Sequence, residues 1–210
     1  SASSAELVAA LESPHGWWRD TVHRLIYERQ DESLTEPLRR LAHQSELPQA
    51  RLHALWSLQG LGMLADSDLA AALADTTPEV RAHAIRLAEP RLNDVSDLHN
   101  RVLSLANDSD LRIRFQLAFT LGQIKSPQAA LALSRLSRND ADNSWMRTAI
   151  LSSVADSAHA VLADLATDPK FAVSVSGAAM LEQLAVVVGV RNRAEQTEQA
   201  LEAIAAVAAP

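Results

Sequence analysis

The strongest constraint on the fold is an arginine that recurs along the chain at nearly constant spacing. Steps of 32, 30, 33 and 33 residues separate five of them: Arg19, Arg51, Arg81, Arg114 and Arg147. An apolar residue lies one position before and three positions after each arginine, and another lies seven positions after the last four. At about 3.6 residues per turn, these offsets share one helical face. The pattern therefore predicts one recurring helix, with the arginine beside its buried stripe.

A shorter apolar-periodic segment precedes each of these helices, so each repeat is predicted to hold two helices. The predicted first helices cover residues 5–11, 34–42, 69–74, 98–106 and 129–136. Four residues are predicted N-caps, because their side-chain oxygens can accept hydrogen bonds from orphan backbone N–H groups: Ser33, Asp66, Ser96 and Ser126. Pro48 and Pro78 are predicted to open second helices, where a missing N–H costs nothing.

A sixth unit follows more loosely, with predicted helices over residues 158–166 and 171–188 and with Ser174 roughly where the arginine should be. A last helix over residues 194–208 is predicted to be half a repeat that closes the stack. The apolar content comes mainly from Ala and Leu, which lose little side-chain freedom in a helix. The sequence therefore predicts an all-α fold, a right-handed α-solenoid of six to seven helix pairs.

All of these repeats are expected to form one domain over residues 1–210. The predicted repeats cover residues 5–30, 33–62, 66–90, 96–125, 126–156 and 157–190, followed by the terminal helix 194–208. The longest apolar stretch, residues 178–190, contains Glu182 and Gln183 and is too short to span a bilayer. It is interpreted as a buried helix.

The period, the two helices and the recurrent arginine resemble the HEAT-like (PBS-lyase-like) repeats. Members of that family often place an aspartate at the turn inside a repeat and an arginine on the second helix, which forms a ladder between neighbours. Asp75 and Asp108 stand six residues before their arginines, whereas the other three repeats have Ser13, Ser45 and Ala141 there. The resemblance implies a partial structural ladder. A cationic stripe that binds carboxylates or phosphates is the alternative.

A narrower resemblance lies in the segment 11–29, which contains Trp17-Trp18-Arg19, and in the run 112–122. Both segments look like the helical part of multidomain membrane-bound dehydrogenase proteins of planctomycetes. In that family a β-propeller related to sugar dehydrogenases precedes the HEAT segment, and a cytochrome c module follows it. The resemblance implies that this chain is a non-catalytic spacer between such domains. It also implies a periplasmic or other extracytoplasmic location.

Three tryptophans are candidate docking residues, because tryptophan is enriched at interface hot spots. They are Trp17, Trp56 and Trp145. Trp18 is expected in the core as the residue before Arg19, and Trp17 is expected toward the N-terminal end. The alternative is that Trp17 and Trp18 only cover the end of the first repeat. Trp56, five residues past Arg51, falls off the core stripe and is expected on the binding surface.

Metal and catalytic chemistry find little support in the sequence. His53 and His83 both lie two residues after a repeat arginine, but helices packed about 8–10 Å apart would strain shared coordination of one ion. The acid pairs 66/68, 108/110 and 140/142 are interpreted as helix caps, because the spacing of a calcium loop is missing. There is no Cys, and no GxSxG, Walker A or HExxH motif occurs. No catalytic, cofactor-binding or metal-binding residue is therefore predicted.

These observations favour a protein-interaction scaffold, with three alternatives considered. A net charge of −7 argues against nucleic acid as a ligand and against an anionic membrane surface. The same acidity weakens the alternative of a HEAT-like enzyme of the alkylpurine DNA glycosylase type, and a bilin lyase would rest on the repeat alone. Homo-oligomerisation through an apolar C-terminal patch, residues 200–210, is the remaining alternative.

Overall fold

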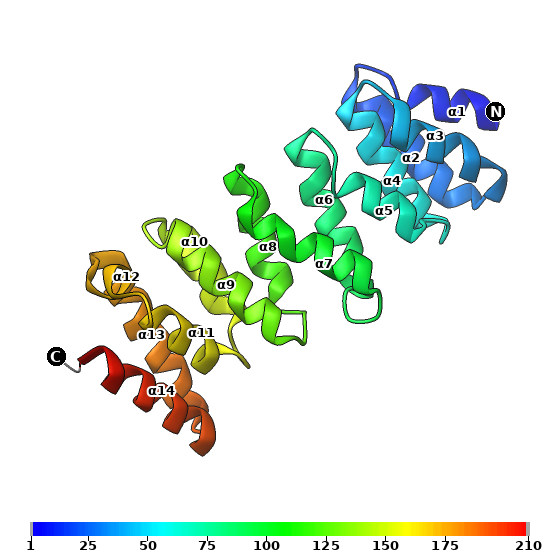
Figure 1. Ribbon diagram of the computed structural model, residues 1–210. Coiled ribbons are helices and arrows are strands. Elements are labelled where there is room, and N and C mark those ends of the chain that lie inside the picture. Colours follow the sequence, from blue (N-terminus) through cyan, green and yellow to red (C-terminus); the bar gives the residue numbers. More distant parts are fainter. Residues whose placement is uncertain (1, 209–210) are drawn as a thin grey trace. The chain divides into compact units, whose positions relative to one another are not determined.

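The structure describes residues 2–208, with side chains to residue 205, and this part is mostly helical (Figure 1). Within these residues the computed structural model contains fourteen α-helices, three short 3-10 turns and no strand. The helices form two compact units that divide after Arg101, inside α7 (Ser96–Ser104). Stacked helix pairs make up each unit, which is the arrangement of an all-α solenoid.

The first unit stacks three helix pairs in two layers. Its first layer holds α1 (Ser4–Ala10), α3 (Thr35–Gln44) and α5 (Asp66–Ala72). Its second layer holds α2 (Gly16–Arg29), α4 (Pro48–Gly60) and α6 (Pro78–Ala88). The 3-10 turns η1 (Glu32–Leu34) and η2 (Glu89–Arg91) continue the chain beside them. Within each layer a helix packs against the next one, so that α3 contacts α1 and α5, and α4 contacts α2 and α6.

The second unit repeats this arrangement after the 3-10 turn η3 (Leu105–Asn107). Its helices are α8 (Leu111–Leu121), α9 (Pro127–Asp140), α10 (Ser144–Ser153), α11 (Ala158–Ala166), α12 (Pro169–Val173), α13 (Val175–Arg191) and α14 (Ala194–Ala208). Here α9 packs on α11 and α11 on α14, while α8 packs on α10 and α10 on α13.

The predicted apolar stripe forms the core of both units. The residues three and seven positions after the arginines are buried, including Ala54, Leu58, Leu117 and Leu121. The residue before each arginine is buried in four repeats, but Trp18 is 51% exposed, so its expected place in the core is wrong. The reason is its position in the first turn of α2, which no preceding helix pair covers among the described residues.

Helix starts follow the predicted chemistry in part. Pro48 and Pro78 open α4 and α6 as predicted. Ser126 caps α9, where its side chain accepts a hydrogen bond from the Ala129 N–H. Ser33 is not a cap, because Asp31 takes that role by accepting from the Ser33 N–H at 3.0 Å.

Two further predicted starts differ in detail. Ala65, not Asp66, is the N-cap of α5, and the carboxylate of Asp68 reaches back to accept from the Ala65 N–H at 3.0 Å. Ser96 is the first residue of α7. The prediction missed the α5 start because an acidic third residue can serve a helix N-terminus as well as an N-cap side chain does.

The predicted helix over residues 171–188 is interrupted at Ser174. Two helices take its place, α12 and α13, and Ser174 between them has an extended backbone with φ −70° and ψ 152°. The Ser174 hydroxyl donates to the Phe171 carbonyl at 2.8 Å and accepts from the Gly177 N–H at 3.0 Å. One side chain therefore ends the first helix and caps the second.

Candidate functional site

Each of the five repeat arginines holds the turn inside its own repeat. In every case Nη1 donates to the backbone carbonyl six residues earlier. The acceptor carbonyls belong to Ser13, Ser45, Asp75, Asp108 and Ala141. Because that carbonyl lies where the chain turns toward the second helix, this bond fixes the angle between the two helices of a repeat.

Bonds between described residues show that Arg51 and Arg114 also hold the turn of the following repeat. Arg51 donates from Nε and Nη2 to the carboxylate of Asp75 at 2.7 and 2.8 Å. Arg114 makes the same fork to Asp140, with both distances 2.7 Å. These side chains are at most 15% exposed, and their donors face the carboxylates. The bonds of these two arginines match a structural ladder better than a cationic stripe open to ligands.

Asp75, one of the two predicted ladder acids, serves as a rung. The acid opposite Arg114 is Asp140, at the end of α9, which the predicted pair did not include. Asp140 was expected to cap a helix and does not. The Asp108 carboxylate accepts from the Asp110 N–H at 2.9 Å, and Asp110 caps α8.

In the part of the chain that the structure describes, Arg19 makes no hydrogen bond or ion pair to the following repeat. Its Nε is buried without a hydrogen-bond partner among the described residues. The next turn carries Ser45 where the following one carries Asp75. Ser45 accepts from the N–H two residues later at 3.3 Å, and Asp75 does the same at 2.8 Å. The two residues therefore occupy equivalent places, and Ser45 presents no carboxylate to Arg19.

Ser45→Asp is expected to stabilise the protein by about 1 kcal/mol, because a carboxylate at this position can accept from the Arg19 Nε. Glu12 opposes the gain, since its carboxylate now accepts from the Ser45 hydroxyl at 2.6 Å and would face a second negative charge. We therefore expect the full gain in a Glu12→Gln background. The measurement is the urea midpoint of unfolding.

The matched control is Ser45→Ala, which removes the hydrogen bond to the Leu47 N–H and adds no carboxylate. It should lower the midpoint. If Ser45→Asp also lowers the midpoint in the Glu12→Gln background, the equivalence between Ser45 and Asp75 is wrong.

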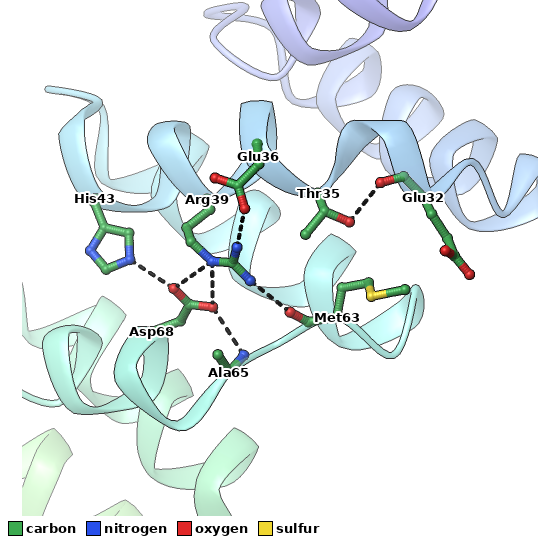
Figure 2. Close-up of polar contacts among 8 residues, drawn as sticks. All are labelled: Glu32, Thr35, Glu36, Arg39, His43, Met63, Ala65 and Asp68. Carbon is green, nitrogen blue, oxygen red and sulfur yellow. Dashed lines mark hydrogen bonds and ion pairs between the residues drawn. The ribbon is translucent and has the colours of Figure 1, made fainter.

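A second buried acid, Asp68, joins α5 to α3 (Figure 2). Its side chain is 1% exposed and accepts from Arg39 Nε at 3.1 Å and from His43 Nε2 at 2.9 Å. Arg39 in turn donates to Glu36 and to the Met63 carbonyl. Burial raises the pKa of Asp68, but the hydrogen bonds from His43, the Ala65 N–H and Arg39 outweigh burial and lower it. Asp68 is thus an ionised structural link.

The other gathering of polar and aromatic side chains lies on the second-layer helices of the first unit. Six residues of α2, α4 and α6 line a pocket of about 330 Å³, which we call the His–Trp pocket: His23, Gln49, Leu52, His53, Trp56 and His83. Gln49 is exposed and the other five are half-buried. None of these side chains belongs to the arginine ladder or to the buried core stripe.

The aromatic rings of the His–Trp pocket contact one another from helix to helix. Trp56 donates from Nε1 to His83 Nδ1 at 3.0 Å, with the ring centroids 6.0 Å apart. The rings of His23 and His53 meet edge to face at 5.7 Å. His23 Nδ1 lies 3.0 Å from the buried Ser57 hydroxyl. These contacts place one indole and three imidazoles on three consecutive helices of the same layer.

The three imidazoles are held in their neutral form. Burial is the main cause that lowers the pKa of His23, of His53 and of His83. The neighbouring Arg86 lowers the pKa of His83 further. His83 needs a free lone pair on Nδ1 to accept from Trp56, and a neutral ring provides it. The pocket is therefore uncharged at neutral pH.

The candidate tryptophans lie in different surroundings. Trp56 is half-buried in the His–Trp pocket. Trp145, in the first turn of α10, is 74% exposed. Trp17 is 66% exposed and meets Trp18 edge to face at 4.7 Å. Only Trp56 combines partial burial with a pocket, which singles it out among the three.

Part of this pocket could be predicted from the sequence. The repeat pattern places His53 and His83 at equivalent positions and Trp56 off the core stripe, whereas it does not connect His23 with them. His23 stands four residues after its arginine, where the next two repeats carry the buried Leu55 and Ile85. A histidine at a position that other repeats fill with core residues is a signal that could have found it.

The second unit has a larger cavity of about 630 Å³, beside the turns that precede α9 and α11. Gly122, Ser126, Ser153 and His159 are among the residues that line it. Its carboxylate, Asp156, is paired with Arg191 at 2.6 Å. None of the residues predicted to be functional lies there.

Three further predictions bear on the described residues. No group of three or more His, Asp or Glu side chains among them could hold a metal ion. None of the helices in the described part is long and apolar enough to cross a membrane. In the predicted C-terminal patch, Leu201 and Ile204 are exposed and Ala200 is buried, while residues 206–210 lie outside the described side chains.

The part of the chain over residues 65–155, which contains stacked helix pairs, matches the family model of HEAT repeats. With the helix pairs of both units, this match supports a HEAT-repeat fold, an all-α solenoid. HEAT repeats generally serve as scaffolds for protein interactions. No curated protein matches the chain.

Proposed function

We propose that this HEAT-repeat chain is a non-catalytic scaffold that binds a protein partner at the His–Trp pocket of α2, α4 and α6. The proposal rests on Trp56, a half-buried indole in a pocket of about 330 Å³. Three neighbouring helices of one layer, α2, α4 and α6, form this pocket. Solenoids commonly bind partners along the extended surface that one layer of helices presents. Interfaces place their strongest contacts at partly buried aromatic residues surrounded by weaker ones.

The contrast with the ladder supports this assignment. Arg51 and Arg114 donate hydrogen bonds to carbonyls and carboxylates of neighbouring turns. This structural role accounts for the recurrence of arginine at their position in the repeat. The His–Trp pocket recurs at one offset only, the one that His53 and His83 share. Its other four members have no counterpart from another repeat among the residues that line the pocket. A surface that departs from the repeat is the place where one solenoid can differ from another in what it binds.

A narrower proposal follows from the resemblance to the multidomain dehydrogenase proteins. In that context the chain would hold a propeller domain and a cytochrome c domain at a defined separation, and it would itself need no cofactor. The partner at the His–Trp pocket would then be a neighbouring domain of the same protein or a separate extracytoplasmic protein. Finding both domains encoded beside this segment would support the spacer role.

Trp56→Ala is expected to weaken binding of ligands at the His–Trp pocket by about tenfold or more, because the indole forms the half-buried centre of that site. Peptides selected for binding to the immobilised wild-type protein supply the ligands. Isothermal titration calorimetry measures each dissociation constant.

Trp145→Ala is the matched control, since Trp145 is exposed on another helix and away from the pocket. It should leave the dissociation constants unchanged. Selected peptides that bind wild type and Trp56→Ala equally well would contradict the proposed binding site. Turnover by the purified chain of sugars, of DNA or of a bilin would contradict its non-catalytic assignment.

A further inference from the structure

The His–Trp pocket is sized for one side chain. Ligand pockets for small molecules span roughly 300–1,000 Å³, and this one, at about 330 Å³, lies at the lower limit. Ring faces and the aliphatic Leu52 make up its walls, with Gln49 as the polar group at its edge. A bulky apolar or aromatic side chain fills such a space, whereas a cofactor with several charged groups would not find partners there.

Charges of both signs stand on the helices that form the pocket. On α2, Arg19 and Asp20 act on His53, and Asp20 Oδ1 lies 3.8 Å from His53 Nε2. On α6, Arg86 acts on His83, and Glu79 stands one helical turn before it. The residue that α4 contributes beside them, Gln49, is uncharged.

Among the described residues, no charged side chain of the other layer lines the pocket. The helices α3 and α5 pack on α4 and α6 from the first layer. On these two helices, Arg39 and His43 both bind the buried carboxylate of Asp68. On α1, Glu6 hydrogen-bonds to Ser3. With neutral imidazoles, an indole and Leu52 in its lining, the pocket suits an uncharged ligand.

Protonation would change this pocket at two points. A protonated His83 carries N–H groups on both nitrogens, so it cannot accept the hydrogen bond from Trp56 that it accepts now at 3.0 Å. Protonated His23 and His53 would be two cations with ring centroids 5.7 Å apart. An apolar occupant that covers these rings also removes the water that would solvate their charge, which opposes protonation further.

We propose that the His–Trp pocket takes one uncharged, apolar or aromatic side chain of a partner polypeptide, and that protonation of its histidines releases that side chain. This inference rests on the proposed function and adds the chemistry of the ligand and its regulation. The neutral pocket binds and the protonated pocket does not, so affinity is complete above the histidine pKa values and falls as the pH falls through them. Those values lie below about 6.5.

The test uses capped glycine–serine peptides with one central tryptophan, lysine or alanine, titrated to about 5 mM against the full chain. NMR signals of the histidine rings report which of the seven histidines is contacted. The tryptophan peptide should shift only His23, His53 and His83. Its dissociation constant should rise at least fivefold between about pH 7.5 and the lower pH at which the ring signals show these histidines protonated. The lysine and alanine peptides should shift none of them.

His83→Gln separates the titration from the shape of the pocket. Glutamine can still accept from the Trp56 N–H through its side-chain oxygen but cannot gain a proton in this pH range. The variant should lose part of the pH dependence, measured relative to its own dissociation constant at pH 7.5. His15→Gln, which changes an exposed histidine outside the pocket, should keep the full pH dependence.

Three results would overturn the inference. The tryptophan peptide could leave the three rings unshifted, or it could bind equally at both pH values. The lysine peptide could bind as tightly as the tryptophan peptide. The proposed function fails separately, when selected ligands do not depend on Trp56. Selected ligands whose binding depends on Trp56 could still have a charged anchor side chain or a dissociation constant that does not change with pH. Either result would contradict the inference and leave the proposed function standing.

Discussion

Asp68→Asn should lower the free energy of unfolding by about 3–5 kcal/mol, one of the two largest effects we expect from a single substitution. The side chain is 1% exposed and accepts hydrogen bonds from Arg39, His43 and the Ala65 N–H (Figure 2). Asparagine has nearly the same shape, so no cavity forms. It offers one acceptor oxygen in place of two and presents an NH₂ group to donors. Urea unfolding measures the loss.

The matched control for Asp68 is Glu28→Gln. Glu28 and Arg24 form an ion pair of 3.6 Å between side chains that are 57% and 68% exposed. Because solvent screens such a pair, its loss should cost at most about 0.5 kcal/mol. Equal losses for the two variants would show that burial does not set the strength of the Asp68 link.

The effect of Asp68→Asn also depends on pH. In the folded protein the pKa of Asp68 lies below its ordinary value of 3.8, since its hydrogen bonds outweigh burial. A carboxylate with a lowered pKa contributes stability above the unfolded value, and this contribution is lost as the pH falls through the folded one. The difference between wild type and variant should therefore be constant above about pH 5 and shrink below about pH 4. A difference that grows on acidification would contradict the ionised state of Asp68.

Periodicity is the part of this fold that a single sequence predicts well. The stripe beside each arginine depends only on offsets within one helix, and it is buried in the structure at nearly every position. Trp18 is the exception, because its burial depends on what covers the first turn of α2 rather than on its own offset. Local pattern predicts which face of a helix is apolar, but not whether a neighbour is there to cover it.

Contacts between repeats are the part that the sequence leaves open. Asp68 was interpreted as a helix cap because it stands just before the predicted helix 69–74, yet its strongest partners, Arg39 and His43, are 29 and 25 residues earlier. The same holds for Asp140, whose partner Arg114 is 26 residues earlier. These pairings depend on the rotation between neighbouring repeats, which no offset within one repeat encodes.

The break between α12 and α13 shows the same limit within one segment. Apolar residues continue with helical spacing from Phe171 through Val188, so the pattern predicts one helix. The hydroxyl of Ser174 instead serves both helix ends. Serine is common at such ends because its side chain competes with the helix for backbone hydrogen bonds. Its presence permits a break but does not require one.

Gly177→Ala tests whether the break is needed. A methyl group on Gly177 would lie 1.8 Å from the Phe171 carbonyl oxygen and 2.7 Å from the Ser174 hydroxyl. Because backbone atoms cannot turn aside as a flexible side chain can, α12 would have to move and Phe171 would leave the core. We expect a loss of about 3 kcal/mol in urea unfolding, near the upper end for overpacking.

Gly189→Ala in the same helix is the matched control, since a methyl group there meets nothing within 4 Å. Helix propensity alone should then stabilise the protein by about 0.5–1 kcal/mol, the opposite sign to Gly177→Ala. If both variants gain stability, residues 171–188 can form the continuous helix that their periodicity predicts. In that case the break at Ser174 would be one of two conformations that this segment can adopt. The close approach of the Phe171 carbonyl to Gly177 would then not be the cause of the separation between α12 and α13.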